Sequence, residues 1–102
     1  MVKSDYTKIS DAIPQLSGVY TLRDKSGKPL YIGKANNLAK RVKSYFHGQK
    51  LPMTKSMLEK AVSITWQETL SEIEALILES VSIKKFRPPF NTLMRDDKQY
   101  FY

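Results

Sequence analysis

Hydrophobic and polar residues along this chain follow periods that predict three short strands. Residues 18–23 and 29–33 are rich in Val, Tyr, Thr, Leu and Ile, which favours two strands of a hairpin. Residues 62–67 alternate strictly, with Val, Ile and Trp against Ser, Thr and Gln, which predicts a third, half-buried strand. The pattern therefore indicates a small, largely antiparallel sheet.

Apolar residues at helical spacing predict three helices beside these strands. The first begins at the N-cap Asn37 and runs to about His47. The second is opened by Pro52 and runs to about Lys60. The third begins at a capping box of Ser71 and Glu74 and runs to about Lys85, where prolines stop it. The apolar positions of this third helix are Ile73, Leu76, Ile77 and Val81, and we expect them to form a stripe that faces the core.

The order of these elements predicts an α/β fold, with a central three-stranded, largely antiparallel sheet flanked by helices. A chain of 102 residues is one domain or a fragment that holds one. We expect residues 1–12 to be a lead-in with at most one short helix, and residues 13–102 to be the domain.

Composition excludes several classes of protein. The sequence has no cysteine, which excludes a disulfide framework and thiolate zinc sites. No apolar run approaches the length of a membrane helix, and the N-terminus lacks the apolar core of a signal peptide. We expect a soluble, cytoplasmic protein that does not act at a membrane.

The net charge of +7 is distributed unevenly. Residues 23–60 hold ten Lys and Arg against two acids, a local balance of +8. Residues 61–80 hold four glutamates and no basic residue. A dense basic block suggests a polyanionic partner, most simply nucleic acid, although a solvated surface would have the same composition.

Two tyrosines form the first candidate site. If residues 24–27 form the hairpin loop, Arg23 pairs with Lys28 and Tyr20 lies directly opposite Tyr31, on the same face. A five-residue loop would put the two tyrosines on opposite faces. A phenol is a weak base near neutral pH, and nearby Lys34 and Arg41 would favour its ionised form.

Three further residues could take part in chemistry on a phosphate. Arg41 and Tyr45 are four residues apart and share a helix face, and arginine grips phosphate through a planar fork of donors. Glu79 is a carboxylate within an apolar run, and a hard divalent ion held by one carboxylate and waters neutralises phosphate charge. His47 is the only histidine and is expected to end a helix rather than to catalyse. We assign no role to Asp96 and Asp97.

These residues together resemble the GIY-YIG nuclease family. Gly18-Val19-Tyr20 stands for its first motif, with valine in place of isoleucine, and Tyr31-Ile32-Gly33 stands for its second. The resemblance continues through Lys34, Arg41, Tyr45, Glu79 and the segment from Ile83 to Asn91, and it is strongest to the UvrC-like branch of excinuclease domains.

The resemblance implies a metal-dependent endonuclease that hydrolyses a phosphodiester bond of DNA. It implies that Tyr20 or Tyr31 activates the attacking water, with Tyr20 slightly favoured. The resemblance further implies roles for the other candidate residues: phosphate contacts for Lys34 and Arg41, one Mg²⁺ or Mn²⁺ on Glu79, and supporting roles for Tyr45 and Asn91.

The resemblance to the UvrC-like branch also implies a biological setting. That branch makes the 3′-side incision of nucleotide excision repair, a DNA-damage response linked to the SOS response, together with a damage-recognition partner of the UvrB type. The other domains of such a subunit have no counterpart in 102 residues, so we expect an excised domain or a small relative.

Three alternatives remain open from the sequence. One is another GIY-YIG enzyme, such as a homing or structure-specific endonuclease. A second is a nucleic-acid-binding module without catalysis, which explains the basic block but gives Glu79 and the paired tyrosines no role. A protein-interaction domain explains the charge least well.

Overall fold

The computed structural model describes residues 3–48 and 50–93. Strands β1 (Gly18–Arg23), β2 (Pro29–Ala35) and β3 (Ser63–Glu68) form one antiparallel sheet in the order β2-β1-β3. The helices are α1 (Lys3–Ile9), the 3₁₀ turn η1 (Ser10–Ala12), α2 (Leu38–Ser44), α3 (Pro52–Lys60), α4 (Glu72–Phe86) and α5 (Pro89–Leu93). The predicted fold class is confirmed.

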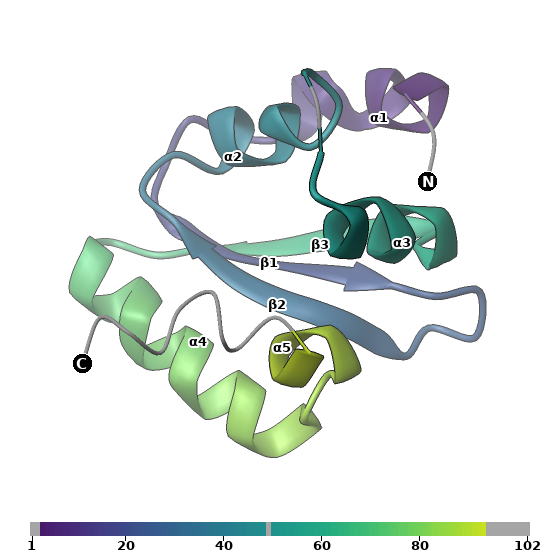
Figure 1. The fold of residues 1–102 in the computed structure, drawn as a ribbon. Helices are drawn as coiled ribbons and strands as arrows, with labels where there is room; N and C mark the ends of the chain where they lie inside the picture. Colours follow the sequence, from purple (N-terminus) through teal and green to yellow (C-terminus); the bar gives the residue numbers. More distant parts are fainter. Residues whose placement is uncertain (1–2, 49, 94–102) are drawn as a thin grey trace.

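The sheet separates two layers of helices (Figure 1). Helices α1, α2 and α3 lie on one side, and α4 and α5 lie on the other. The main core fills the first side, where it includes the tyrosines of both strands and Leu38 and Val42 of α2. A smaller cluster of Val19, Ile32 and Ala75 joins the sheet to α4. None of the described helices is long and apolar enough to cross a membrane.

The hairpin between β1 and β2 has a different register from the predicted one. Tyr20 pairs with Gly33, and Tyr31 pairs with Leu22, so the two tyrosines are not directly opposite each other. The loop closes through Asp24, whose backbone N–H donates to the Lys28 carbonyl at 3.0 Å.

The two tyrosines nevertheless share a face because two irregularities compensate. Arg23 pairs with Pro29, so the loop holds five residues, which alone would place the tyrosines on opposite faces. An irregularity between Leu22 and Arg23 shifts the register by one further residue and restores the shared face. The expected convergence of Tyr20 and Tyr31 therefore holds through a register that was not predicted.

Helix boundaries agree closely with the sequence pattern, with two exceptions. The Asn37 side chain caps α2 by accepting from the Lys40 N–H at 3.0 Å, but α2 ends at Ser44 and not near His47. Ser71 caps α4 as expected, by accepting from the Glu74 N–H at 3.1 Å. Helix α5 was not predicted, because the prolines that end α4 also supply a favourable first residue for the next helix.

The expected apolar stripe of α4 faces solvent. Ile73, Leu76, Ile77 and Val81 are between 50% and 71% exposed. The residue that α4 buries is Ala75, with Leu78 and Ile83 partly buried beside it. The expectation that the stripe faces the core was therefore wrong. Val62, expected on the buried face of the third strand, is also exposed and lies before β3.

Candidate active site

Three tyrosines meet on the face of the sheet that α2 covers. The Tyr20 and Tyr45 hydroxyls are 2.6 Å apart and share a hydrogen bond. The Tyr31 ring lies beside Tyr20, with ring centroids 6.2 Å apart and tilted planes. All three rings are almost completely buried. The cluster thus joins both hairpin strands to the C-terminal end of α2.

The backbone of β2 passes directly beneath the Tyr20 ring. A Cβ atom added to Gly33 would lie 2.5 Å from the Tyr20 Oη and 2.7 Å from its Cζ. This proximity follows from the register, which pairs these two residues across β1 and β2. The glycine of the second motif therefore provides the space in which the tyrosine of the first motif lies.

Arg41 bridges the tyrosine cluster and solvent. Its Nε donates to the Tyr20 hydroxyl at 3.3 Å, and its Cζ lies 5.4 Å from the centroid of the Tyr45 ring. The proximity of the Tyr20 phenol raises the pKa of Arg41, so the guanidinium stays charged. Because the side chain remains exposed and lines an open groove, it can meet an anion from outside.

Burial keeps the three phenols protonated near neutral pH. It raises the pKa of Tyr20 to about 12, with nearby Tyr31 adding to the shift and Arg41 opposing it. Burial also raises the pKa of Tyr31 and of Tyr45. Arg41 does lower each phenol's pKa, as the sequence suggested, but desolvation is the larger effect.

Glu79 approaches the same region from the opposite layer. Its Oε2 accepts a hydrogen bond from the backbone N–H of Lys34 at 2.9 Å, so α4 reaches around the outer edge of β2. The carboxylate also contributes to the raised pKa of Tyr31. Glu79 therefore lies close enough to the Tyr31 phenol to act on it electrostatically.

The donor set around Glu79 suits a single hard cation with several waters. Among residues 3–48 and 50–93, no cluster of three or more His, Cys, Asp or Glu side chains is present. One partly buried carboxylate is the kind of ligand that Mg²⁺ accepts while keeping most of its water. Asp96 and Asp97 lie outside the described residues.

Asn91 holds the same edge of β2 from α5. Its Oδ1 accepts from the Ile32 N–H at 2.8 Å, and its Nδ2 donates to the Ile32 carbonyl at 2.9 Å. The side-chain amide therefore pairs with β2 as a neighbouring strand would. This fixes the strand segment between Tyr31 and Lys34.

An open groove of about 440 Å³ lies where β2 leads into α2. It is lined by Lys34, Ala35, Asn36, Asn37, Lys40, Arg41 and Ser44. Lys34 and Arg41 were predicted, whereas Asn36, Lys40 and Ser44 were missed. The spacing along the helix could have found Lys40 and Ser44, since they share one helix face with Asn37 and Arg41. His47 does not line this groove.

Comparison with known proteins decides the family. A family model described as a UvrC-like GIY-YIG domain matches residues 16–92. The chain belongs to the UvrC-like GIY-YIG family. This confirms the resemblance drawn from the motifs, and it favours the UvrC-like branch over the homing and structure-specific branches.

Two curated relatives of this chain are named UvrABC system protein C. The one from Dictyoglomus thermophilum is 54% identical over 87 residues, covering 85% of this chain and 14% of the relative. The one from Coxiella burnetii strain Dugway is 50% identical over 90 residues, covering 88% of this chain and 15% of the relative. The chain thus spans about one seventh of the length of the curated relatives that it matches.

A solved relative of the family has the same fold. The N-terminal GIY-YIG endonuclease domain of UvrC from Thermotoga maritima matches with a TM-score of 0.78 and 36% identity, covering 89% of this chain and 99% of that one. That crystal structure holds magnesium as its catalytic divalent cation. Variants of the Thermotoga domain with tyrosine-to-phenylalanine substitutions also hold the cation.

Proposed function

We propose that this chain is a divalent-metal-dependent DNA endonuclease domain that hydrolyses one phosphodiester bond. The observation that carries the proposal is the meeting of Arg41, the buried tyrosines and Glu79 at one edge of β2. A cation, a set of proton-bearing hydroxyls and a metal-binding carboxylate are the groups that phosphate hydrolysis requires.

The phosphate side of the site consists of Arg41 and Lys34. Both line the open groove, where a DNA strand would place its phosphate against the exposed guanidinium. Arg41 is held in position by the Tyr20 hydroxyl and the Tyr45 ring, so its donors need little rearrangement when charge develops on the phosphate. Lys34 adds a second positive charge to the same groove.

The carboxylate side of the site is Glu79, which accepts a hydrogen bond from the Lys34 N–H. Asn91 holds the neighbouring part of β2 in place through its hydrogen bonds to Ile32. A divalent cation such as Mg²⁺ or Mn²⁺ bound there would neutralise charge on the phosphate and lower the pKa of nearby groups. The Thermotoga variants that keep the cation without a tyrosine hydroxyl support a carboxylate rather than a phenol as ligand.

Tyr31 would be the better candidate for the group that takes the proton of the attacking water, provided that a cation on Glu79 lowers its pKa enough to ionise the phenol first. Tyr31 lies on β2, the strand whose Lys34 N–H binds Glu79, and this carboxylate acts on the pKa of Tyr31. Tyr20 and Tyr45 then act as positioning residues for Arg41. This assignment reverses the slight preference for Tyr20 that the sequence suggested.

The names of the relatives support a place in nucleotide excision repair. We assign to this domain the 3′-side incision, made in the cytoplasm and together with excinuclease partners that locate the damage. We assign residues 13–102 to the catalytic domain and residues 1–12 to a lead-in, of which Tyr6 and Ile9 pack against the core.

Nicking of supercoiled plasmid with Mg²⁺ or Mn²⁺ tests the proposal. Glu79→Gln should abolish nicking and weaken Mn²⁺ binding measured by titration calorimetry, while DNA affinity stays the same. Glu72→Gln, on the exposed first turn of the same helix, is the matched control and should nick normally. Equal nicking by wild type and Glu79→Gln would refute the assignment of the ligand.

Single-turnover rates at saturating enzyme test the role of Arg41. Removing a contact that stabilises the transition state costs roughly 3–4 kcal/mol, so Arg41→Ala should slow the chemical step about 10²–10³-fold. Lys43→Ala, an exposed change on the same helix outside the groove, should have little effect. DNA binding that is independent of metal, with no nicking under any condition, would instead support a binding module.

A further inference from the structure

Helix α2 carries two neighbouring cations, Lys40 and Arg41, and the protein holds them differently. Arg41 is fixed to the tyrosine cluster, because its Nε donates to the Tyr20 hydroxyl and its guanidinium lies against the Tyr45 ring. Lys40 is exposed and lines the same open groove. Within the described residues 3–48 and 50–93, no hydrogen bond or ion pair engages the Lys40 ammonium. Lys40 is therefore available to a ligand, whereas Arg41 is partly engaged by the protein.

The two side chains leave α2 in different directions. Successive residues of an α-helix lie about 100° apart around a cylinder about 10–12 Å wide, which separates the two charged ends by about 8 Å. Arg41 is directed to Tyr20 and Tyr45, so Lys40 lies farther from the tyrosine cluster. A DNA strand carries one negative charge on every phosphate, and two cations at this separation can each contact a different one.

Both side chains start from a backbone that Asn37 fixes. The Asn37 Oδ1 accepts from the Lys40 N–H at 3.0 Å, and the Asn37 carbonyl accepts from the Arg41 N–H at 3.0 Å. The Ser44 hydroxyl also lines the groove, but it donates to the Arg41 carbonyl at 2.6 Å, so its proton is already engaged. Among the described residues of the groove's lining, Lys34, Lys40 and Arg41 are positive and none is acidic. The groove thus offers an anion three positive charges without an opposing carboxylate.

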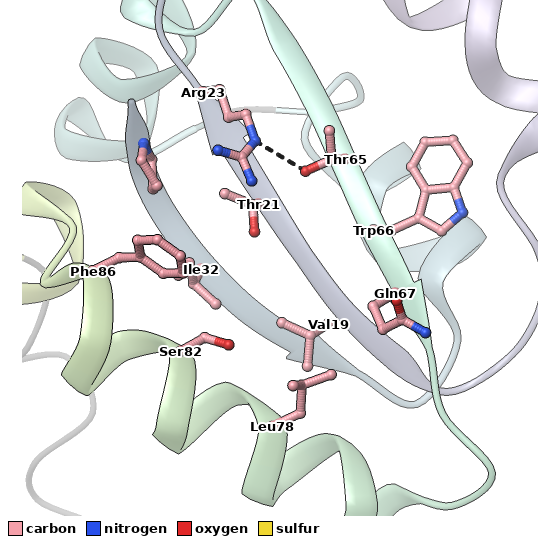
Figure 2. A pocket seen from close by; sticks show the side chains of 11 residues that line it. Val19, Thr21, Arg23, Ile32, Thr65, Trp66, Gln67, Leu78, Ser82 and Phe86 are labelled. Carbon is pink, nitrogen blue, oxygen red and sulfur yellow. Dashed lines mark hydrogen bonds between the residues drawn. The ribbon is translucent and has the colours of Figure 1, made fainter. Parts of the chain in front are cut away.

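A separate cavity of about 290 Å³ between α4 and the sheet is a poorer place for a phosphate (Figure 2). Arg23 is the only cation among its described lining residues. Figure 2 shows the bond from Arg23 Nε to Thr65 Oγ1, at 3.1 Å, and the Nη1 of Arg23 donates to the Gly27 carbonyl at 3.0 Å. One cation that is bonded to the protein attracts a polyanion less than three cations in one groove do.

We propose that Lys40 binds a phosphate of the DNA strand next to the phosphate that Arg41 contacts. The role depends on the proposed nuclease function, which it extends by one binding contact. Lysine suits such a contact, because an ammonium on a flexible stem acts as a point charge. The contact is made equally in the bound substrate and in the transition state, so it strengthens DNA binding and leaves the chemical step unchanged. Arg41, in contrast, acts on charge that develops during the chemical step.

The dependence of DNA affinity on salt tests the contact. Fluorescence anisotropy of a labelled duplex, without divalent metal so that no strand is cut, gives the affinity of each variant between about 50 and 200 mM salt. Each phosphate contact contributes about 0.9 to the slope of log affinity against log salt concentration. Lys40→Gln should therefore lower the slope by about 0.9 and the affinity about tenfold near 0.1 M salt.

Two further variants separate a local contact from a general loss of charge. Lys43→Gln removes the same charge from an exposed position of the same helix that does not line the groove, and it should leave the slope nearly unchanged. Lys40→Arg keeps the charge and should keep the wild-type slope. Because both lysines are exposed, circular dichroism should show that all three variants are folded.

Nicking under single-turnover conditions separates binding from chemistry. Lys40→Gln should raise the enzyme concentration that gives half of the maximal rate about tenfold, and should leave the rate at saturating enzyme unchanged. Arg41→Ala should instead lower the rate at saturating enzyme.

Two results would overturn the proposal. A salt slope of Lys40→Gln equal to that of wild type or of Lys43→Gln would make Lys40 a solvated charge. A lower rate at saturating enzyme, with no change in the half-saturating concentration, would place Lys40 in the chemical step. Failure of the nuclease function is a different result: the wild-type chain would nick under no condition, and the salt slopes would still decide whether Lys40 contacts a phosphate.

Discussion

The substitution Gly33→Ala tests whether the backbone of β2 shapes the position of Tyr20. The added Cβ would lie 2.5 Å from the Tyr20 Oη. The ring has little freedom to move, because it is fully buried and its hydroxyl is 2.6 Å from that of Tyr45. Overpacking of a buried position costs about 1–3 kcal/mol of the free energy of unfolding.

A second effect of Gly33→Ala opposes the clash, so the sign of the change in the free energy of unfolding shows which of the two is larger. Among the described residues, positive φ angles occur only at Gly27, Gly48 and Arg87, so the backbone at Gly33 permits alanine. Where the conformation permits it, glycine to alanine stabilises a protein by about 0.4–1 kcal/mol through the unfolded chain. The clash should exceed this gain, which leaves Gly33→Ala destabilising in the wild-type chain.

The same substitution should become stabilising when the Tyr20 ring is absent. In a Tyr20→Leu background no aromatic ring lies over Gly33, so only the gain from the unfolded chain remains. Urea unfolding followed by circular dichroism gives the four stabilities of this double-mutant cycle, with an expected coupling of about 1–3 kcal/mol. An equal cost of Gly33→Ala in both backgrounds would refute the explanation by contact.

Three further predictions concern pH and individual hydrogen bonds. Burial raises the pKa of Tyr20 to about 12, above its ordinary value, so the stability that the buried phenol contributes should be full below about pH 10 and lost as the pH rises towards 12. Urea unfolding over this range should show that the free energy of unfolding falls less steeply with pH for Tyr20→Phe than for wild type. Asn91→Ala leaves the Ile32 N–H and carbonyl without their side-chain partner and should cost about 1–3 kcal/mol in urea unfolding, whereas an unchanged midpoint would mean that water replaces the amide. Ser71→Ala removes the cap of α4 and should cost about 1 kcal/mol in thermal unfolding, while Ser80→Ala on the exposed face of the same helix serves as the control and should cost little.

The sequence predicted which tyrosines meet but not how the hairpin brings them together. Motif residues and β-propensity predict strands and a turn, and those features are local. The register depends on Asp24, whose Oδ1 accepts from the Ser26 N–H at 2.9 Å and the Lys28 N–H at 3.0 Å and so stabilises the five-residue loop. The compensating shift at Leu22 has no counterpart in the hydrophobic pattern, because it depends on how loop and strands fit together.

Periodicity also could not identify which face of α4 is buried. The apolar residues occupy most of the helix circumference, and a pattern without a clear polar face does not select one side. Burial of Ala75 allows α4 to approach β1 and β2 closely, and Glu79 then reaches the edge of β2. The pairing of Asn91 with Ile32 was likewise beyond the sequence, since it joins residues 59 positions apart.

The hydrogen bonds that Asn91 and Glu79 make to β2 have a consequence for solubility as well as for chemistry. An edge strand offers a row of unpaired N–H and carbonyl groups, to which a strand of another molecule can add. Asn91 and Glu79 occupy three of these groups on β2, at Ile32 and Lys34. The side chains that position the site therefore also prevent edge-to-edge pairing between molecules. Variants at these two positions should aggregate more readily during refolding than variants of Arg41, whose guanidinium bonds the Tyr20 hydroxyl rather than the backbone of β2.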